Sequence, residues 1–328
     1  MKIIGIGNAI VDVICKVSDD FLDKNSLIKS TMKLIDENEF KGLLSELTIH
    51  ETVSGGSVAN SIVGLAQLNN EVGFIGKINS DELGVKYEKG LKKENVNYLY
   101  KKKEENLPTG TCLILITPDS ERTMCTFLGI AGKINENDIN EKYIKESQIT
   151  FLEGYLWDEG EPRKAFDKAI SCSNKVAMSL SDLFCVERHK DQFLSLVKNK
   201  LDITFANEQE IMALIDAKKF EEVITFTKQI KKHIVVTRGA SGSMVINNGK
   251  VYEIPAKQNL KIVDLTGAGD LFAAGYLHGF LNNFDIKDNL EQGTDLSSSI
   301  IQAVGVWLFG FLKQQITNYS HSQCNKLN

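Results

Sequence analysis

A segment near the C-terminal end of the chain places three small residues and a carboxylate just before an apolar helical stretch. It runs from Asp264 to Asp270 (DLTGAGD) and continues as LFAAGYL. The first N–H groups of a helix have no partners within the helix and carry partial positive charge, so Gly267, Ala268 and Gly269 are suited to hold a phosphate. Asp270 would then take the proton of a hydroxyl that attacks the phosphate. Ordinary helix capping explains the same residues, so both interpretations are open for the segment alone.

Two further segments combine glycine with side chains that recognise hydroxyl groups. Asn8 and Asp12 follow the first apolar strand, and Gly55-Gly56 precedes a helix that carries Asn60. Amide, carboxylate and backbone N–H groups in such places could bind a polyol. The alternatives are structural, because Asn and Asp also bond their own backbone in turns, and Ser57 would cap the helix after a simple loop.

Two more segments are candidates for binding a nucleotide and its metal ion. Asn207 and Glu210 have the Asn-x-x-Glu spacing of a capping box, which is a structural device, yet the same groups also suit a hydrated Mg²⁺ ion. Thr237, Gly239 and Gly242 belong to a glycine-bearing turn after a strand, which suits a phosphate or a ribose. Hairpin geometry is the alternative for this turn.

The elements around these segments alternate between strand and helix over most of the chain. This alternation indicates parallel crossovers and a sheet covered on both faces, which is an α/β fold. Ligands of such sheets bind beyond the carboxyl ends of the strands, where the segments above are expected. The predicted strands are 2–7, 72–76, 149–153, 176–180, 202–206 and 233–237, the predicted helices are 57–69, 82–94, 161–172, 187–199, 207–215, 219–231, 268–282 and 287–312, and a hairpin is predicted at 243–254.

A second predicted hairpin interrupts this alternation of strands and helices. Residues 110–117 and 122–128 are rich in β-forming residues and flank Pro118-Asp119-Ser120-Glu121, whose composition favours a turn. Arg122 follows this turn, and an arginine that swings over a transferring phosphoryl group stabilises its charge. An exposed hairpin residue is the alternative interpretation of Arg122.

The hairpin and the stretch 13–50 are predicted to combine as a small lid on one large domain. The chain shows no internal repeat and no low-complexity linker between them. The predicted large nucleotide-binding domain comprises 1–12, 51–96 and 129–313, the lid comprises 13–50 and 97–128, and a polar tail follows at 314–328.

Composition excludes several classes of function. The 328 residues are 42% hydrophobic with a net charge of −5, which gives no general attraction to nucleic acid or anionic lipid. The six cysteines form no Cys-x-x-Cys pair, so a zinc or thioredoxin-like site is unsupported. Cysteine usage and the lack of a signal peptide or a long apolar run predict a cytoplasmic protein with small-molecule partners and no membrane span.

Taken in order, these segments resemble the PfkB, or ribokinase-like, family of carbohydrate and nucleoside kinases. Residues 55–84 resemble the first signature of the family, and residues 264–279 resemble its second, more specific signature. The resemblance implies a ribokinase-like three-layer α/β/α fold with a mostly parallel central sheet and a small β-rich lid. Within the family, the chain is most similar to adenosine kinases. The segments that carry this similarity are residues 21–27, 108–112 and 202–208.

The resemblance also implies ATP and Mg²⁺ as cofactors and a role for each candidate residue, while activation by a monovalent cation stays open. Asp270 would be the general base, and the transferred phosphoryl group would meet Gly267, Ala268, Gly269 and Arg122. The implied substrate contacts are Asn8, Asp12, Gly55, Gly56 and Asn60, with Tyr155 against the nucleobase; the implied ATP contacts are Thr237, Gly239, Gly242 and Thr266; the implied metal residues are Asn207 and Glu210.

The expected function is ATP- and Mg²⁺-dependent phosphorylation of the 5′-hydroxyl of a ribonucleoside, with adenosine converted to AMP in purine salvage. One alternative is a PfkB-type sugar kinase that acts on fructose, ribose or a keto-deoxy sugar acid. An alternative from another class is a catalytically silent nucleoside-binding module. Whether the protein is a monomer or a homodimer stays open.

Overall fold

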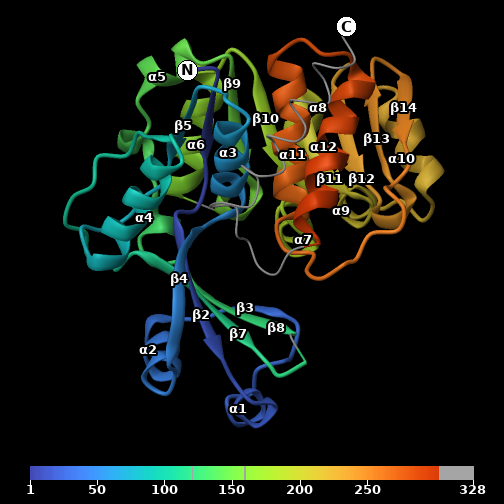
Figure 1. The fold of residues 1–328 in the computed structure, drawn as a ribbon. Helices are drawn as coiled ribbons and strands as arrows, with labels where there is room; N and C mark the ends of the chain where they lie inside the picture. Colours follow the sequence, from blue (N-terminus) through green and yellow to red (C-terminus); the bar gives the residue numbers. More distant parts are fainter. Residues whose placement is uncertain (120, 159, 303–328) are drawn as a thin grey trace, which may run out of the picture.

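Nine strands of the described residues form one large, mostly parallel sheet (Figure 1). The computed structural model describes residues 1–119, 121–158 and 160–302. In spatial order the strands are β14 (Lys250–Ile254), β13 (Ser243–Asn247), β12 (His233–Thr237), β11 (Ile203–Asn207), β10 (Val176–Ser179), β9 (Ile149–Glu153), β1 (Ile3–Ile6), β5 (Val72–Ile75) and β6 (Asn97–Tyr98). Neighbouring strands are parallel from β12 to β6, whereas β13 and β14 form the predicted antiparallel hairpin at one edge.

Helices cover both faces of the large sheet, so the predicted three-layer α/β/α architecture is confirmed. One layer contains α3 (Ser57–Gln67), α11 (Ala268–Leu281) and α12 (Ile286–Ile300), with α11 packed between the other two and α4 (Glu82–Lys93) beside β6. The other layer contains α5 (Glu141–Glu146), α6 (Glu161–Cys172), α8 (Lys190–Asn199), α9 (Glu208–Leu214) and α10 (Phe220–Thr227).

The apolar core is divided in two by the sheet, because successive side chains of a strand point to opposite faces. Ile3 packs into the core under α3 and α11, whereas Ile4 packs into the core under α6 and α9. Val235 and Val236 repeat this division on β12. The strands of the large sheet are thus buried on both faces, as is usual for parallel sheets.

A second sheet projects below the large sheet in Figure 1 and corresponds to the lid-like part expected from the sequence. Its order is β3 (Met32–Leu34), β8 (Arg122–Phe127), β7 (Gly110–Ile116), β2 (Ile10–Lys16) and β4 (Ile49–Gly55), accompanied by α1 (Asp19–Lys24) and α2 (Glu37–Ser45). β7 and β8 pair antiparallel as the predicted hairpin. The exact residue limits of the two domains stay a prediction.

Some local expectations differ from the structure. The predicted helix 187–199 is two helices, α7 (Leu183–Arg188) and α8, because the side chain of Asp182 caps a helix that starts at Leu183. Asp12 lies within β2 rather than in a loop after β1. The predicted helix 287–312 is described as α12 only as far as Ile300; its part from residue 303 onward and the predicted tail 314–328 lie outside the described residues. Within the described part of the chain, no helix is both long and apolar enough to cross a membrane.

Candidate active site

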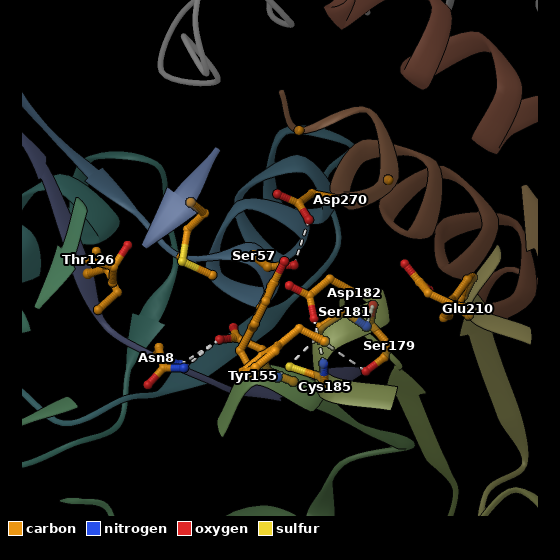
Figure 2. A pocket seen from close by; sticks show the side chains of 18 of the residues that line it. Asn8, Ser57, Thr126, Tyr155, Ser179, Ser181, Asp182, Cys185, Glu210 and Asp270 are labelled. Carbon is orange, nitrogen blue, oxygen red and sulfur yellow. Dashed lines mark hydrogen bonds between the residues drawn. The ribbon is translucent and has the colours of Figure 1, made fainter. Parts of the chain in front are cut away.

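A cavity of about 550 Å³ lies at the carboxyl ends of the large sheet, between that sheet and the lid (Figure 2). Its lining brings together predicted site residues that are far apart in the sequence. They are Asn8, Asp12, Gly56, Tyr155, Asn207, Glu210, Thr237, Thr266, Gly267, Gly269 and Asp270. The other predicted residues are not part of the lining: Gly55, Asn60, Ala268, Arg122, Gly239 and Gly242.

Asp270 lies in the first turn of α11, and its carboxylate faces α3 (Figure 2). Ser57 Oγ donates a hydrogen bond of 2.6 Å to one carboxylate oxygen, and Asn60 Nδ2 donates one of 2.9 Å to the other. Burial raises the pKa of Asp270 to about 6, although these two donors act in the opposite direction. Asn60 therefore supports the carboxylate from behind the cavity wall.

The loop before α11 has the geometry of an anion site. Gly267 caps the helix in the left-handed region, with φ of +77°, which favours glycine. At Gly269, a Cβ atom would have open space around it, so the approach to the first turn is clear. Ala268 lies between them in the first turn, where N–H groups lack helical acceptors. This loop can therefore receive a phosphoryl group beside Asp270.

Arg122 connects the lid to this loop. Its guanidinium lies 3.1 Å from the carboxylate of Asp264, and both side chains are largely buried. The other oxygen of Asp264 accepts hydrogen bonds from the backbone N–H of Thr266 (3.0 Å) and from its hydroxyl (2.8 Å). The start of β8 is thus tied to the segment that shapes the anion site.

The lid side of the cavity carries polar groups that suit substrate hydroxyls. Asp12 lines it from the lid strand β2, and Gly55 packs so closely on this carboxylate that a Cβ would lie 2.5 Å from its Oδ2. Gly56 has φ of +101°, a conformation that favours glycine. Burial raises the pKa of Asp12 to about 7, with Arg122 lowering it and Asp270 raising it further.

An apolar wall closes this end of the cavity on the lid side. Ile10, Met124 and Leu128 pack together there, and the exposed β3 adds Met32 and Leu34. Tyr155 lines the cavity from the short helix after β9 (Figure 2). Tyr155 and this wall therefore line the same cavity.

Asn207 and Glu210 form a complete capping box at the start of α9. The backbone and side-chain N–H groups of Asn207 donate to the carboxylate of Glu210, at 3.0 and 2.6 Å, and the backbone N–H of Glu210 donates to Asn207 Oδ1 at 2.8 Å. Burial raises the pKa of Glu210 to about 7, and the nearby charge of Asp182 contributes. The Asn-x-x-Glu segment therefore serves as a helix cap, and the carboxylate of Glu210 also faces the cavity.

On the nucleotide side, Thr237 ends β12 and lines the cavity, whereas the turn after it does not. Gly242 has φ of +90° and lies against the backbone of Ile254, so hairpin geometry requires glycine there. Gly239 also has a positive φ, of +53°, but a Cβ atom there would have open space.

The profile of pfkB family carbohydrate kinases matches residues 24–308. The chain belongs to the PfkB family. Membership makes it a phosphotransferase with an alcohol group as acceptor and implies ATP as the donor. Gly267, Gly269 and Asp270, at the start of α11, line the cavity of this kinase.

Similar proteins of the PfkB family include both nucleoside and sugar kinases. The chain is 26% identical to adenosine kinase 2 of Arabidopsis thaliana, with 92% of this chain and 94% of the relative covered. It is 28% identical to a 5-dehydro-2-deoxygluconokinase of Clostridium botulinum, with 79% and 81% covered. The crystal structure of an adenosine kinase from Sinorhizobium meliloti superposes with a TM-score of 0.89, at 32% identity and with 97% and 99% covered.

Three residues of this candidate site were missed by sequence reasoning. Ser57, expected as a helix cap, is the first residue of α3 and bonds Asp270, while Gly56 occupies the cap position. Glu153 ends β9 and lines the cavity, and Asp182 does so from the start of α7. Asn8 was selected as a polar residue at the carboxyl end of a strand. The same rule would have selected Glu153, because Glu153 comes at the end of an apolar run and precedes a glycine.

Proposed function

We propose that this PfkB kinase transfers the terminal phosphoryl group of ATP to the 5′-hydroxyl of a ribonucleoside, with adenosine as substrate and AMP as product. The observation that carries the proposal is the carboxylate of Asp270 beside the N-terminus of α11. Among the described residues it has hydrogen-bond donors but no ion-pair partner. A carboxylate beside an anion site repels a bound anion, so its presence favours proton removal over binding alone.

In the proposed mechanism, Asp270 takes the proton of the attacking hydroxyl. The N–H groups of Gly267, Ala268 and Gly269 receive the negative charge of the phosphoryl group. Arg122 reaches the same group from the lid when it leaves Asp264. Closure of the lid excludes water, which would otherwise accept the phosphoryl group.

The nucleotide and its metal are assigned to the other side of the anion site. Thr237, Gly239, Gly242 and Thr266 are the proposed ATP contacts, although only Thr237 and Thr266 line the cavity.

The oxygen donors near α9 fit a hydrated Mg²⁺ ion. Glu210 and Asp182 both line the cavity, and the charge of Asp182 disfavours ionisation of Glu210, a repulsion that a divalent cation would relieve. Mg²⁺ keeps most of its waters and needs only one or two carboxylates from the protein. Glu210, Asn207 and Asp182 would hold this hydrated ion, which supplies charge neutralisation between the phosphates when bound.

The apolar wall favours a nucleoside over a sugar. A monosaccharide carries hydroxyl groups on nearly every carbon and would leave Met32, Met124 and Leu128 in contact with polar groups or water. A nucleobase presents a flat face with little polarity to such a wall and to Tyr155. Asn8 and Asp12 at the same end would bind the ribose hydroxyls.

A sugar kinase is the second candidate, and one finding favours it. The similarity to 5-dehydro-2-deoxygluconokinase spans 79% of this chain. The hydroxyl-binding groups Asn8 and Asp12 would serve a sugar acid as well as a ribose. This alternative requires the apolar wall to move away from the substrate.

The test is a coupled ADP-release assay of the full chain with ATP and Mg²⁺ over a panel of nucleosides and sugars. Adenosine should give a kcat/KM at least about tenfold above ribose, fructose and 5-dehydro-2-deoxygluconate, since burial of a nucleobase adds several kcal/mol of binding. A sugar preferred over every nucleoside would overturn the proposal. Nucleoside binding in calorimetry with no ADP release would favour the silent binding module.

A further inference from the structure

The cavity lining contains an ion pair that the proposed mechanism does not use. Nη2 of Arg188 lies 3.6 Å from Oδ1 of Asp158, and both residues line the cavity. The two side chains are 37% and 57% exposed, so both are accessible to a ligand. An ion pair this exposed contributes little to stability, which gives little structural reason for its place in the lining.

Arg188 is held in one orientation by contacts on different sides of its guanidinium. Nε donates a hydrogen bond of 3.0 Å to Nε2 of His189, which is 4% exposed. The guanidinium also stacks over the ring of Phe184, 5.2 Å from the ring centroid, and Phe184 lines the same cavity. These contacts leave Nη2 as the donor group beside Asp158, and a donor that is already oriented loses little entropy when a ligand binds.

Asp158 follows a tryptophan that anchors its segment. Trp157 is 3% exposed and packs against Phe166 and Phe193, with ring centroids 5.7 and 6.2 Å apart. Tyr155, on the other side of this anchor in the sequence, lines the cavity (Figure 2). One short segment therefore brings both an aromatic ring and a carboxylate to the cavity.

The chemistry of the pair selects a neutral ligand with a mixed polar edge. A carboxylate only accepts hydrogen bonds and a guanidinium only donates them, so the cavity is offered an acceptor directly beside a donor. The opposite charges balance, which disfavours an anion such as a sugar acid. An aminopurine carries a matching edge, because its 6-amino group donates and the neighbouring ring nitrogen accepts. Hypoxanthine has an oxygen at position 6, which would meet the Asp158 carboxylate with no hydrogen between them.

We propose that Asp158 and Arg188 recognise the polar edge of the nucleobase and make this kinase selective for a 6-aminopurine. Asp158 accepts from the 6-amino group, and Arg188 donates to the ring nitrogen beside it. This inference rests on the proposed function, which supplies the nucleoside. Neither residue touches the reacting atoms, so the effect of replacing them falls on KM more than on kcat.

Asp158→Asn is the main test. Its NH₂ group can donate to the oxygen at position 6 of inosine, where the carboxylate only accepts. The measurement is kcat and KM of the full-length enzyme for adenosine and inosine with ATP and Mg²⁺. The wild type should prefer adenosine by about tenfold or more in kcat/KM, and in Asp158→Asn this preference should fall by about tenfold, with a lower KM for inosine.

A gain of affinity for inosine is not a result that a damaged fold produces. A wild type with no preference for adenosine over inosine would overturn the inference. An unchanged preference in Asp158→Asn would also overturn it.

Two further variants test each half of the pair. Asp158→Ala removes the acceptor, so the preference of the wild type for adenosine over purine riboside, which lacks the 6-amino group, should fall from about tenfold to about twofold or less. Arg188→Met keeps a long side chain against Phe184 but no donor, and should raise the KM for adenosine by about tenfold with kcat changed by less than about twofold. An unchanged KM, or a loss confined to kcat, would exclude Arg188 from the recognition of the base.

The matched control is Asp216→Asn. Asp216 pairs with Lys190 at the start of the neighbouring helix α8, and neither residue is part of the cavity lining. Asp216 has φ of +55°, a conformation that asparagine also adopts, so the substitution suits the backbone. The preference for adenosine over inosine should persist in this variant, and an equal shift here would overturn the inference.

The outcomes separate this inference from the proposed function. If the wild type phosphorylates nucleosides and the Asp158 variants leave both preferences unchanged, the inference fails and the proposed function stands. If the wild type phosphorylates a sugar and no nucleoside, both fail. If Asp158→Asn does not fold, as judged by its melting temperature, the purine riboside comparison in Asp158→Ala decides.

Discussion

Ser57 and Asp270 are 213 positions apart in the chain, yet the hydroxyl of Ser57 donates a hydrogen bond of 2.6 Å to the Asp270 carboxylate. Asn60 holds the second oxygen, and the hydroxyl of Ser61 donates to the backbone oxygen of Asp270 at 2.8 Å. The first turns of α3 thus orient the carboxylate at the start of α11. A proton acceptor held in this way is oriented before the substrate arrives.

Asp270→Asn should retain the fold and the affinity for ATP but lower kcat by about two orders of magnitude or more, because a general base contributes about 10²–10⁴-fold. Steady-state kinetics and ATP binding by calorimetry measure the two effects. Near-normal turnover in this variant would mean that another group removes the proton.

The acidic limb of the pH profile of kcat/KM should shift when Ser57 is replaced by alanine. Asp270 has a pKa of about 6 and acts as a base only when ionised, so kcat/KM should fall as the pH drops through about 6. The Ser57 hydrogen bond lowers this pKa, and Ser57→Ala should therefore move the limb to higher pH by about one unit.

The matched control for this shift is Ser61→Ala. Ser61 bonds the backbone oxygen of Asp270 and not its carboxylate, so this variant should leave the limb in place. Burial raises the pKa of Asp12, Glu153 and Glu210 to about 7, and each could produce a limb of its own. An acidic limb that does not shift in Ser57→Ala would indicate that one of these three carboxylates, and not Asp270, produces it.

Asp270→Asn should also stabilise the protein at alkaline pH. The pKa of Asp270 is raised from 3.8 to about 6 on folding, so its stabilising contribution is complete below about pH 4 and is lost as the pH rises through 6. Asparagine avoids this loss; its oxygen can accept from Asn60 while its NH₂ group donates to the Ser57 hydroxyl, which then acts as acceptor. The melting temperature of the variant should exceed that of the wild type at pH 8 by about 2 °C or more, and by less at pH 5. Equal differences at the two pH values would contradict the raised pKa.

Gly269→Val should weaken ATP binding and phosphoryl transfer without unfolding the protein. The added side chain enters open space in front of the first turn of α11, where the phosphoryl group is proposed to bind. Gly42→Val is the control, because Gly42 is also a helical glycine with open space around its Cβ but lies in α2 of the lid. Normal ATP binding in Gly269→Val would remove this loop from the anion site.

Arg122→Ala should lower kcat more than it raises the KM for the nucleoside, since the guanidinium is proposed to meet charge that develops during transfer. The expected loss of kcat is about 10–10³-fold. Lys24→Ala removes another ion pair of the lid, the exposed Lys24–Glu46 pair, and should have little effect. An unchanged kcat in Arg122→Ala would leave its pairing with Asp264 as a purely structural contact.

The order of strands and helices was predictable because its signals are local. Apolar runs such as 149–153 and 233–237 fixed the strands of the large sheet, and the glycines before Asp270 marked the start of α11. The rule for open α/β sheets then placed Asn8, Thr237 and Asp270 at one edge, where the structure has them.

Contacts between distant segments were not predictable in this way. Nothing near Ser57 indicates Asp270, and nothing near Asn8 indicates that Glu153 holds its amide. The apolar wall was missed because β3 is short and exposed, so Met32 and Leu34 lack the pattern of a buried strand. These features depend on how the two sheets meet, which a single sequence does not encode locally.

The connection between β1 of the large sheet and β2 of the lid is short. β1 ends at Ile6 and β2 begins at Ile10, and the three residues between them are buried. A shift of β2 by one residue in its pairing with β4 and β7 would turn Asp12 toward the opposite side of its strand, because side chains alternate at every step. The short, buried connection therefore helps to determine which face of β2 carries Asp12.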